Sequence, residues 1–272
     1  MIDMLVIGEK INASIKPVAE AIVARDKEFI ENLARSQADA GADFIDVNAG
    51  TGQGTVAQQI EGMEWLIDVV QNATDKPLTI DSDVPQMIQA ALKKYRGETV
   101  MINSISAERD RLNMVESLTT KQNVLLVALA MGDAGIPDNV EQRLEACKTI
   151  MDHVTGIGLK EEQILFDPLV LPISVDSKQG LVTLRTIEQI KKHYPAARTV
   201  MGLSNVSYGL PSRGLVNRGF LLMASYAGLD AAIIDPLDKK AMSMIKVADM
   251  LNGKDPYCKN YIRSYRKGAI TG

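Results

Sequence analysis

The stretch Met201-Gly202-Leu203-Ser204-Asn205-Val206-Ser207 decides the fold, because a short apolar run stops there abruptly in glycine, serine and asparagine. This pattern is typical of a buried strand whose carboxyl end opens into a polar pocket. Similar endings recur directly after apolar segments, at Glu9-Lys10-Ile11-Asn12, Asp46-Val47-Asn48, Asp81-Ser82-Asp83, Asn103-Ser104 and Asp167-Pro168. A series of such endings along one chain predicts the mouth of a barrel.

The apolar runs predict eight strands. They are continuously apolar, as in parallel strands that are covered on both faces. The predicted strands are residues 4–11, 44–47, 78–80, 100–102, 124–129, 164–166, 199–203 and 231–234.

An amphipathic helical segment follows each predicted strand. In residues 27–40, Phe29, Ile30, Leu33 and Ala34 form an apolar stripe, and Gln37 is expected to face water with the charged residues. The other predicted helices are residues 56–71, 84–94, 107–119, 140–156, 180–192, 215–227 and 239–251.

This alternation predicts a single (β/α)8 barrel over residues 1–272, with its active site at the carboxyl ends of the strands. The structural alternative is a doubly wound open sheet. Against it, the first turn, residues 7–12, contains no GxGxxG, and no switch-point signal divides the chain into halves.

Composition limits the classes of function. The formal net charge of -4 indicates no general affinity for nucleic acid, and no apolar stretch approaches the ~20 residues of a membrane span. Cys147 and Cys258 form neither a disulfide framework nor a CxxC metal motif. Since the amino terminus has no basic region before its apolar run, we expect a cytoplasmic protein.

The polar residues expected at the mouth are almost all carboxylates and carboxamides: Glu9, Asn12, Asp46, Asn48, Asp81, Asp83, Asn103, Asp133, Asp167, Asn205 and Asp235. Histidine is absent from this set, because His153 falls in a predicted helix and His193 directly follows the end of another. Histidine-based zinc sites and Ser-His-Asp triads are therefore not expected. We interpret His193 as a favourable charge at a helix end.

Carboxylates and carboxamides suit a flat nitrogen heterocycle, whose edge presents a row of donors and acceptors. Magnesium bound by the same carboxylates is the competing chemical interpretation, although no strand end has a convincing DxD or ExD spacing. Asp and Asn also cap helices and form turns, and this is the preferred interpretation for Asp83 and Asp138.

At these residues the chain resembles a known family, the methyltetrahydrofolate:corrinoid protein methyltransferases. The resemblance runs from residue 4 to about residue 261 and depends on an ordered set of motifs rather than on any one of them. These motifs are Ile7-Gly8-Glu9-Lys10-Ile11-Asn12, Glu64-Trp65-Leu66, Ile80-Asp81-Ser82, Met101-Ile102-Asn103-Ser104, Asp167-Pro168-Leu169, Gly202-Leu203-Ser204-Asn205-Val206-Ser207, Asn217-Arg218 and Gly228-Leu229-Asp230-Ala231-Ala232-Ile233.

The wider superfamily of pterin-binding barrels also includes dihydropteroate synthases and the folate domain of cobalamin-dependent methionine synthase. The chain lacks the synthases' Asn-Val-Thr-Pro-Asp-Ser-Phe type loop and their basic Ser-Arg-Lys type segment, and it reads Asn12-Ala13-Ser14-Ile15-Lys16 and Gly202-Leu203-Ser204-Asn205 instead. It carries neither a zinc-binding homocysteine module nor a cobalamin module, so a separate corrinoid protein is expected as its partner.

The resemblance implies a role for each matching residue. Asp81, Asn103 and Asp167 would hold the polar edge of the pterin, helped by Gly202 and Ser204, and Asn205 would lie next to N5. Further candidate binding residues are Asn12, Asp46, Asn48, Ser207, Arg213 and Arg218, and weaker candidates for loop contacts are Lys16, Gln53 and Asp133.

The activity implied is transfer of a methyl group between 5-methyltetrahydrofolate and a corrinoid (cobalamin) carried by the partner protein, with no metal bound by this chain. The family further suggests a homodimer, and no nucleic-acid or membrane partner is expected. The direction of transfer stays open, as in acetyl-CoA synthesis or, in reverse, O-demethylation. The alternative functions are a non-catalytic folate-binding component of a methyl-transfer complex and a metal-dependent barrel enzyme.

Overall fold

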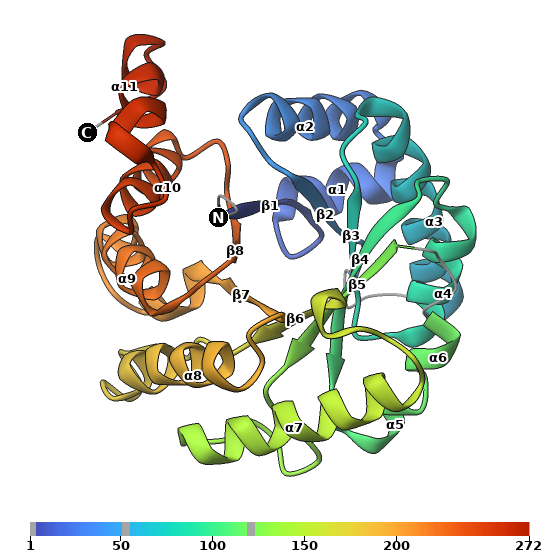
Figure 1. The fold of residues 1–272 in the computed structure, drawn as a ribbon. Helices are drawn as coiled ribbons and strands as arrows, with labels where there is room; N and C mark the ends of the chain where they lie inside the picture. Colours follow the sequence, from blue (N-terminus) through green and yellow to red (C-terminus); the bar gives the residue numbers. More distant parts are fainter. Residues whose placement is uncertain (1–3, 51–54, 119–122, 272) are drawn as a thin grey trace.

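The computed structural model describes residues 4–50, 55–118 and 123–271. Within them, parallel strands β1 to β8 close into a barrel in the order in which they occur in the chain, and helices surround it (Figure 1). The predicted (β/α)8 barrel is confirmed and the open sheet is wrong, because β1 pairs with β8 from Leu5↔Ala231 to Gly8↔Ile234.

All eight predicted strands are present. Their bounds are β1 Leu5–Asn12, β2 Phe44–Asn48, β3 Leu78–Asp81, β4 Thr99–Ser106, β5 Asn123–Leu129, β6 Ile164–Asp167, β7 Arg198–Gly202 and β8 Ala231–Ile234. The largest difference is at β4, which continues past the polar Asn103-Ser104 pair. After an irregularity in register, Ile105 and Ser106 pair with Ala128 and Leu129.

Most predicted helices have nearly the predicted bounds: α2 Lys27–Asp39, α3 Val56–Ala73, α4 Pro85–Lys94, α7 Val140–Gly156, α8 Gln179–His193, α9 Arg213–Ala227 and α10 Lys239–Leu251. The predicted helix at 107–119 is instead two single turns, α5 Arg109–Leu112 and α6 Val115–Leu118. Two helices were not predicted, α1 Lys16–Ala24 and α11 Lys259–Arg266. Proline in the first turn of α1 is a helix-start signal.

The expected caps are displaced by one residue. Asn139, not Asp138, is the N-cap of α7, and its Oδ1 accepts from Gln142 N at 2.9 Å. Val84, not Asp83, occupies the N-cap of α4, which begins at a proline that has no N–H in need of an acceptor.

Gln37 of α2 is fully buried, contrary to the expectation that it faces water. Its Oε1 accepts from Lys10 N at 3.0 Å, where the register between β1 and β2 is irregular. Gly8 leaves room for it, because a Cβ there would lie 2.6 Å from Gln37 Oε1. Phe29 of the predicted apolar stripe is 38% exposed.

Two apolar clusters form the core. The smaller is built from strand residues only and fills the barrel: Ile7, Phe44, Met101, Val127, Leu165, Val200 and Ala231. The larger joins strand residues to the inner faces of the helices. None of the helices in residues 4–50, 55–118 and 123–271 has the length and apolar character needed to cross a membrane.

Candidate functional site

Strand geometry places a ring of polar residues at the carboxyl end of the barrel. Successive side chains alternate between the two faces of a strand, so a residue two positions after an interior residue also points inward. The interior residues Ile7, Phe44, Thr79, Met101, Leu165, Val200 and Ile233 are followed at that spacing by Glu9, Asp46, Asp81, Asn103, Asp167, Gly202 and Asp235. We call the second set, from Glu9 to Asp235, the strand-end ring.

Carboxamides connect the ring from strand to strand. Asn48 Nδ2 donates to Asp81 Oδ2 at 2.9 Å, and Asn103 Nδ2 donates at 3.5 Å to Asp46 Oδ1. Asp81 and Asn103 are also register partners of β3 and β4. Four of the predicted binding residues, from three adjacent strands, are thus brought together.

Burial makes the ring electrostatically unusual. Desolvation, followed by the nearby Asp81 charge, raises the pKa of Asp46 well above its usual range, although the Asn103 hydrogen bond opposes this. Desolvation also raises the pKa of Asp81. The pKa of Glu9 is raised to about 7, first by desolvation and then by Asp235. The ring therefore holds carboxyl groups that can exchange protons near neutral pH.

Asp167 lies at the end of β6, in a sharp turn. Burial raises its pKa to about 6, against the opposing effects of a hydrogen bond from Leu169 N to Asp167 Oδ1, at 2.8 Å, and of the charge on Arg143. Leu169 has a positive φ of 67°, so the backbone turns sharply two residues after the carboxylate.

Asn205 lies on a short 3-10 helix, η2 Leu203–Ser207, that follows β7. Its side chain is exposed, whereas Ser207 is buried. Arg213, in the first turn of α9, fastens this helix: its Nη2 donates to Ser204 O at 2.7 Å and its Nε to Ser207 Oγ at 3.1 Å. Asn205 Nδ2 lies 3.8 Å from the position that a Cβ at Gly202 would take, which is an ordinary van der Waals contact.

Other candidates have mainly structural contacts. Asn12 Oδ1 accepts from Ser14 N at 2.9 Å, and Asp133 Oδ1 accepts from Arg109 N at 3.3 Å. Arg218 forms an ion pair of 3.9 Å with Asp238, and Lys16 one of 3.9 Å with Glu20. Gln53 lies outside the described residues.

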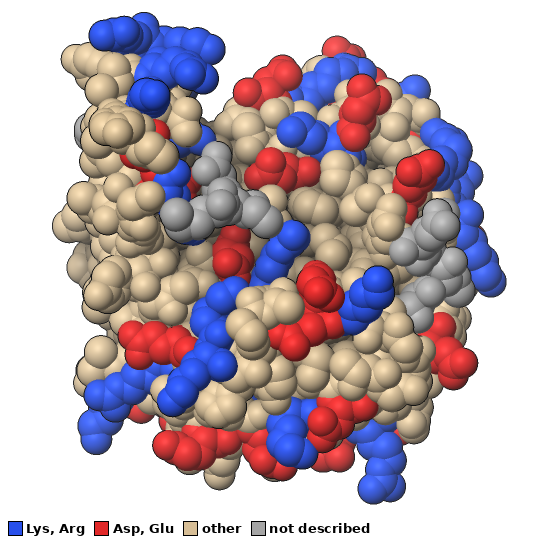
Figure 2. Space-filling model, in the orientation of Figure 1, with Lys and Arg blue, Asp and Glu red and all other residues tan. Residues whose placement is uncertain are grey.

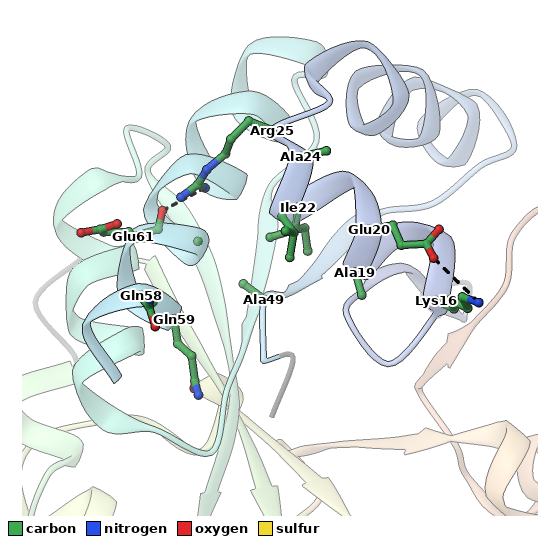
Figure 3. Close-up of a pocket in the computed structure, with 12 residues that line it drawn as sticks. Lys16, Ala19, Glu20, Ile22, Ala24, Arg25, Ala49, Gln58, Gln59 and Glu61 are labelled. Atoms are coloured by element: carbon green, nitrogen blue, oxygen red, sulfur yellow. Dashed lines mark hydrogen bonds and ion pairs between the residues drawn. The ribbon is translucent and has the colours of Figure 1, made fainter. Parts of the chain in front are cut away.

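A cavity of about 750 Å³ lies beside the ring, between α1 and the start of α3 (Figure 3). Ala49, one residue after Asn48, forms part of its wall, and Ile22 projects toward it from α1. On the rim of the cavity, Arg25 donates to Glu61 O at 3.3 Å, and its guanidinium group lies over the indole of Trp65. The cavity could not be predicted without α1.

On the face shown in Figure 2, charges of both signs are interspersed, and Lys and Arg gather on α11. Both histidines lie in last turns of helices, and His193 Nδ1 is 2.8 Å from Gln189 O, which confirms its place at a helix end. In the part of the chain that the structure describes, no three His, Cys, Asp or Glu residues are grouped as metal ligands.

Sequence reasoning missed two contacts of the ring. Lys10 Nζ forms an ion pair of 3.2 Å with Asp235, across the closure of the barrel from β1 to β8. Arg143 of α7, which is fully buried, donates to the carbonyls of Pro168 and Leu169 beside Asp167. The only available signal for Arg143 was an arginine on the apolar side of a predicted helix.

The barrel, with carboxylates and carboxamides at its strand ends, defines the class, and the chain belongs to the pterin-binding enzyme family, whose model matches residues 9–235. One relative is the methylcorrinoid:tetrahydrofolate methyltransferase of Eubacterium limosum, which is 35% identical over 269 residues, or 98% of each chain. The methionine synthase of Mycobacterium tuberculosis is 30% identical over 245 residues, which are 85% of this chain and 20% of that protein.

Solved structures show the same fold. A dihydropteroate synthase (folP) of Coxiella burnetii, in complex with pteroic acid, superposes with a TM-score of 0.70 at 15% sequence identity, and the match covers 94% of this chain and 95% of that one. The resemblance seen in the sequence is confirmed at the level of the family.

Proposed function

We propose that the protein is a methyltransferase that moves a methyl group between N5 of 5-methyltetrahydrofolate and the cobalt of a corrinoid carried by a partner protein. The observation that carries this proposal is the full-length likeness to a protein whose name pairs the same two groups, methylcorrinoid and tetrahydrofolate. The whole chain acts as one pterin-binding domain, and the partner docks over the carboxyl end of the barrel, where the ring lies.

The ring fits the polar edge of a pterin. A carboxylate accepts two N–H bonds from an aminopyrimidine edge, and a carboxamide both donates and accepts. Asp81 and Asp167 accept hydrogen bonds from the N–H groups of the pterin, and Asn103 donates to its ring acceptors. Asn48 already donates to one oxygen of Asp81, at 2.9 Å, which leaves the other oxygen for the ligand.

The reaction is a displacement at carbon. The reduced corrinoid supplies the electron pair that forms the new bond to the methyl carbon, while the pair of the carbon–N5 bond stays on nitrogen. Because expelling a nitrogen anion is prohibitive, N5 must gain a proton, which water supplies, as the bond breaks. The Asn205 carboxamide oxygen accepts a hydrogen bond from that N5–H, and it strengthens as positive charge develops.

One transition state serves both directions. The proposal therefore covers methyl delivery from folate to a corrinoid protein and the reverse flow, as in O-demethylation of aryl methyl ethers. It places the reaction in the cytoplasm, because a Co(I) corrinoid needs a reducing compartment, and Cys147 and Cys258 are both free thiols.

Asn205→Ala tests the mechanism. Loss of a contact made mainly in the transition state is expected to lower the rate of cob(I)alamin methylation about 10²–10³-fold, with little change in the folate dissociation constant. Asp81→Asn is the matched variant, because it should raise that constant and affect the chemical step less. Unchanged turnover in the Asn205 variant would remove the proposed role.

A second experiment separates catalysis from binding alone. The protein is titrated with 5-methyltetrahydrofolate, cob(I)alamin is added, and loss of the Co(I) absorbance is followed. We expect transfer that depends on the protein and persists in the presence of a chelator. Folate binding without transfer would identify a non-catalytic folate-binding component instead.

We also propose that the protein is a homodimer that associates through helices on the side of the barrel. α9 exposes three large apolar side chains, Leu215, Met223 and Tyr226, the last of them 83% exposed. Their spacing of eight and three residues puts them on one face of the helix. Leu251, at the end of the adjacent α10, extends this apolar face.

A further inference from the structure

Arg143 is the most deeply buried charged side chain close to the ring. It is fully buried, and its hydrogen-bond acceptors are all neutral oxygens: Pro137 O at 3.1 Å, Pro168 O at 2.7 Å, Leu169 O at 2.9 Å, Gln179 Oε1 at 2.9 Å and Thr183 Oγ1 at 3.5 Å. Burying a cation is costly unless its donors are satisfied, so this set of acceptors must remain assembled around it.

Two of these acceptors belong to the turn that carries Asp167. Pro168 O and Leu169 O both accept hydrogen bonds from Arg143 Nη1. Thr183 Oγ1 of α8 also donates to Leu169 O, at 2.9 Å. Leu169 N in turn donates to Asp167 Oδ1. A continuous chain of contacts therefore runs from the helix layer, through the turn, to one oxygen of the ring.

The turn needs such an anchor. A left-handed backbone at a leucine persists only where surrounding contacts hold it, at a cost of about 1–3 kcal/mol. Leu169 has this conformation, with a φ of 67°. If Arg143 were removed, both carbonyls would lose the guanidinium donor, and the turn could relax and shift the Asp167 carboxylate.

We propose that Arg143 is a positioning residue of the folate site, which acts from the outer layer of the barrel by fixing the Asp167-Pro168-Leu169 turn and by placing a positive charge near the Asp167 carboxyl group. This deepens the proposed function and depends on it only for the identity of the ligand. Arg143 does not touch the substrate itself.

The electrostatic part follows from the groups around the carboxylate. Arg143 of α7 lowers the pKa of Asp167, while burial raises it. Besides burial, the charge on Asp167 raises the pKa of the Cys147 thiol, the other titratable group of α7 that interacts with it. Burial lowers the pKa of Arg143, and Asp138, in the preceding loop, opposes this change. Removing the cation leaves burial unopposed by a charge. The pKa of Asp167 must then rise above about 6.

The first test needs no ligand. The Asp167 carboxyl is titrated in the intact protein by carbon-13 NMR, with Asp167→Asn to assign its signal. In Arg143→Gln its midpoint is expected to rise by roughly one pH unit or more. Arg143→Lys, which keeps the charge but not the planar fork, should show a smaller rise. An unchanged midpoint in Arg143→Gln overturns the electrostatic role.

The second test uses tetrahydrofolate and calorimetry between pH 5.5 and 8, a range chosen to bracket roughly the region in which the carboxylate titrates. Arg143→Gln should weaken binding about tenfold or more at pH 7, with the loss growing as the pH falls. A purely structural role would lower the unfolding temperature and leave the pH profile of the dissociation constant unmoved, and this result would contradict the proposal.

Two threonines of α8 provide a matched pair if Arg143→Gln folds poorly. Thr183 and Thr186 are both fully buried, but Thr186 Oγ1 donates only within its own helix, to Val182 O, whereas Thr183 Oγ1 reaches the turn. Thr183→Val should weaken tetrahydrofolate binding about fivefold and Thr186→Val should not. Equal affinities in the two variants would overturn the positioning role.

The two tests also separate this inference from the proposed function. If the wild-type chain binds no tetrahydrofolate while the Asp167 midpoint still rises in Arg143→Gln, the folate function fails and the positioning of Asp167 stands. If folate binds equally to all the variants and the midpoint is unmoved, the function stands and the role of Arg143 fails.

Discussion

At the scale of single residues, the strand-end ring holds carboxyl groups whose ionised forms are disfavoured by burial. Asp46, Asp81 and Glu9 all have raised pKa values, and burial is the largest cause in each. A ligand that donates N–H bonds to these carboxyl groups favours their ionised forms and lowers the pKa values again. Part of the stability lost in the free protein should therefore be recovered when the ligand binds.

Glu9 offers a measurable consequence of this strain. Because its pKa rises from 4.5 to about 7 on folding, the protonated carboxyl stabilises the folded state below pH 4.5, and this contribution is lost as the pH rises through 7. Glu9→Gln abolishes the titration. The variant should gain on the order of 2–3 kcal/mol of unfolding free energy relative to wild type between pH 5 and pH 8.

Urea denaturation at a series of pH values measures this difference. Glu20→Gln is a suitable control, because Glu20 is exposed and its ion pair with Lys16 is long, at 3.9 Å. That variant should track the wild type within about 0.5 kcal/mol at every pH. A constant offset between Glu9→Gln and wild type across the pH range would show that Glu9 does not titrate near neutrality.

At the scale of elements, strands were easier to predict than helix ends. A strand buried on both faces is continuously apolar, so its bounds follow from local composition. Helix starts depend on which polar side chain reaches the first free N–H groups, and Asp138 and Asn139 are equally suitable in sequence. The backbone decides in favour of Asn139, which is extended, with φ −132° and ψ 166°.

The cap of α7 leads to a prediction about the stability of that helix. Asn139→Ala removes the acceptor of Gln142 N and should lower the unfolding free energy by about 1 kcal/mol. Asp138→Asn leaves the cap intact, and a surface charge change of this kind is expected to cost about 0.5 kcal/mol or less. Thermal unfolding of both variants measures the difference, and an equal loss in the two would contradict the assignment of the cap.

The pattern-based prediction failed where helices are short. Residues 107–119 have helical composition, yet Asn113 and Met114 separate α5 from α6. In α11, by contrast, Asp255 accepts from both Asn260 N and Tyr261 N at 2.9 Å, so a carboxylate from outside the helix satisfies two N–H groups of its first turn. No side chain of α11 is buried, so packing against the core does not fix this helix.

At the scale of the whole molecule, the exposed apolar face of α9 predicts how two copies meet. Tyr226→Glu should convert the proposed dimer to a monomer, because it would place a charge in an apolar contact. Tyr265→Glu on α11 is the matched control, since Tyr265 is also well exposed, at 67%, but lies outside this face. Light scattering after size-exclusion chromatography gives both masses, and a dimer that survives Tyr226→Glu would exclude this face.

The strands, their order and the polar residues that end them can be predicted from sequence, because these features depend on local composition and on the alternation of side chains. Which of those residues become neighbours depends on how the barrel closes. Asn48 bonds to Asp81 across 33 residues, and Asn103 to Asp46 across 57. The raised pKa values and the anchoring of Asp167 by Arg143 arise from burial and from charges on distant elements, which no local pattern encodes.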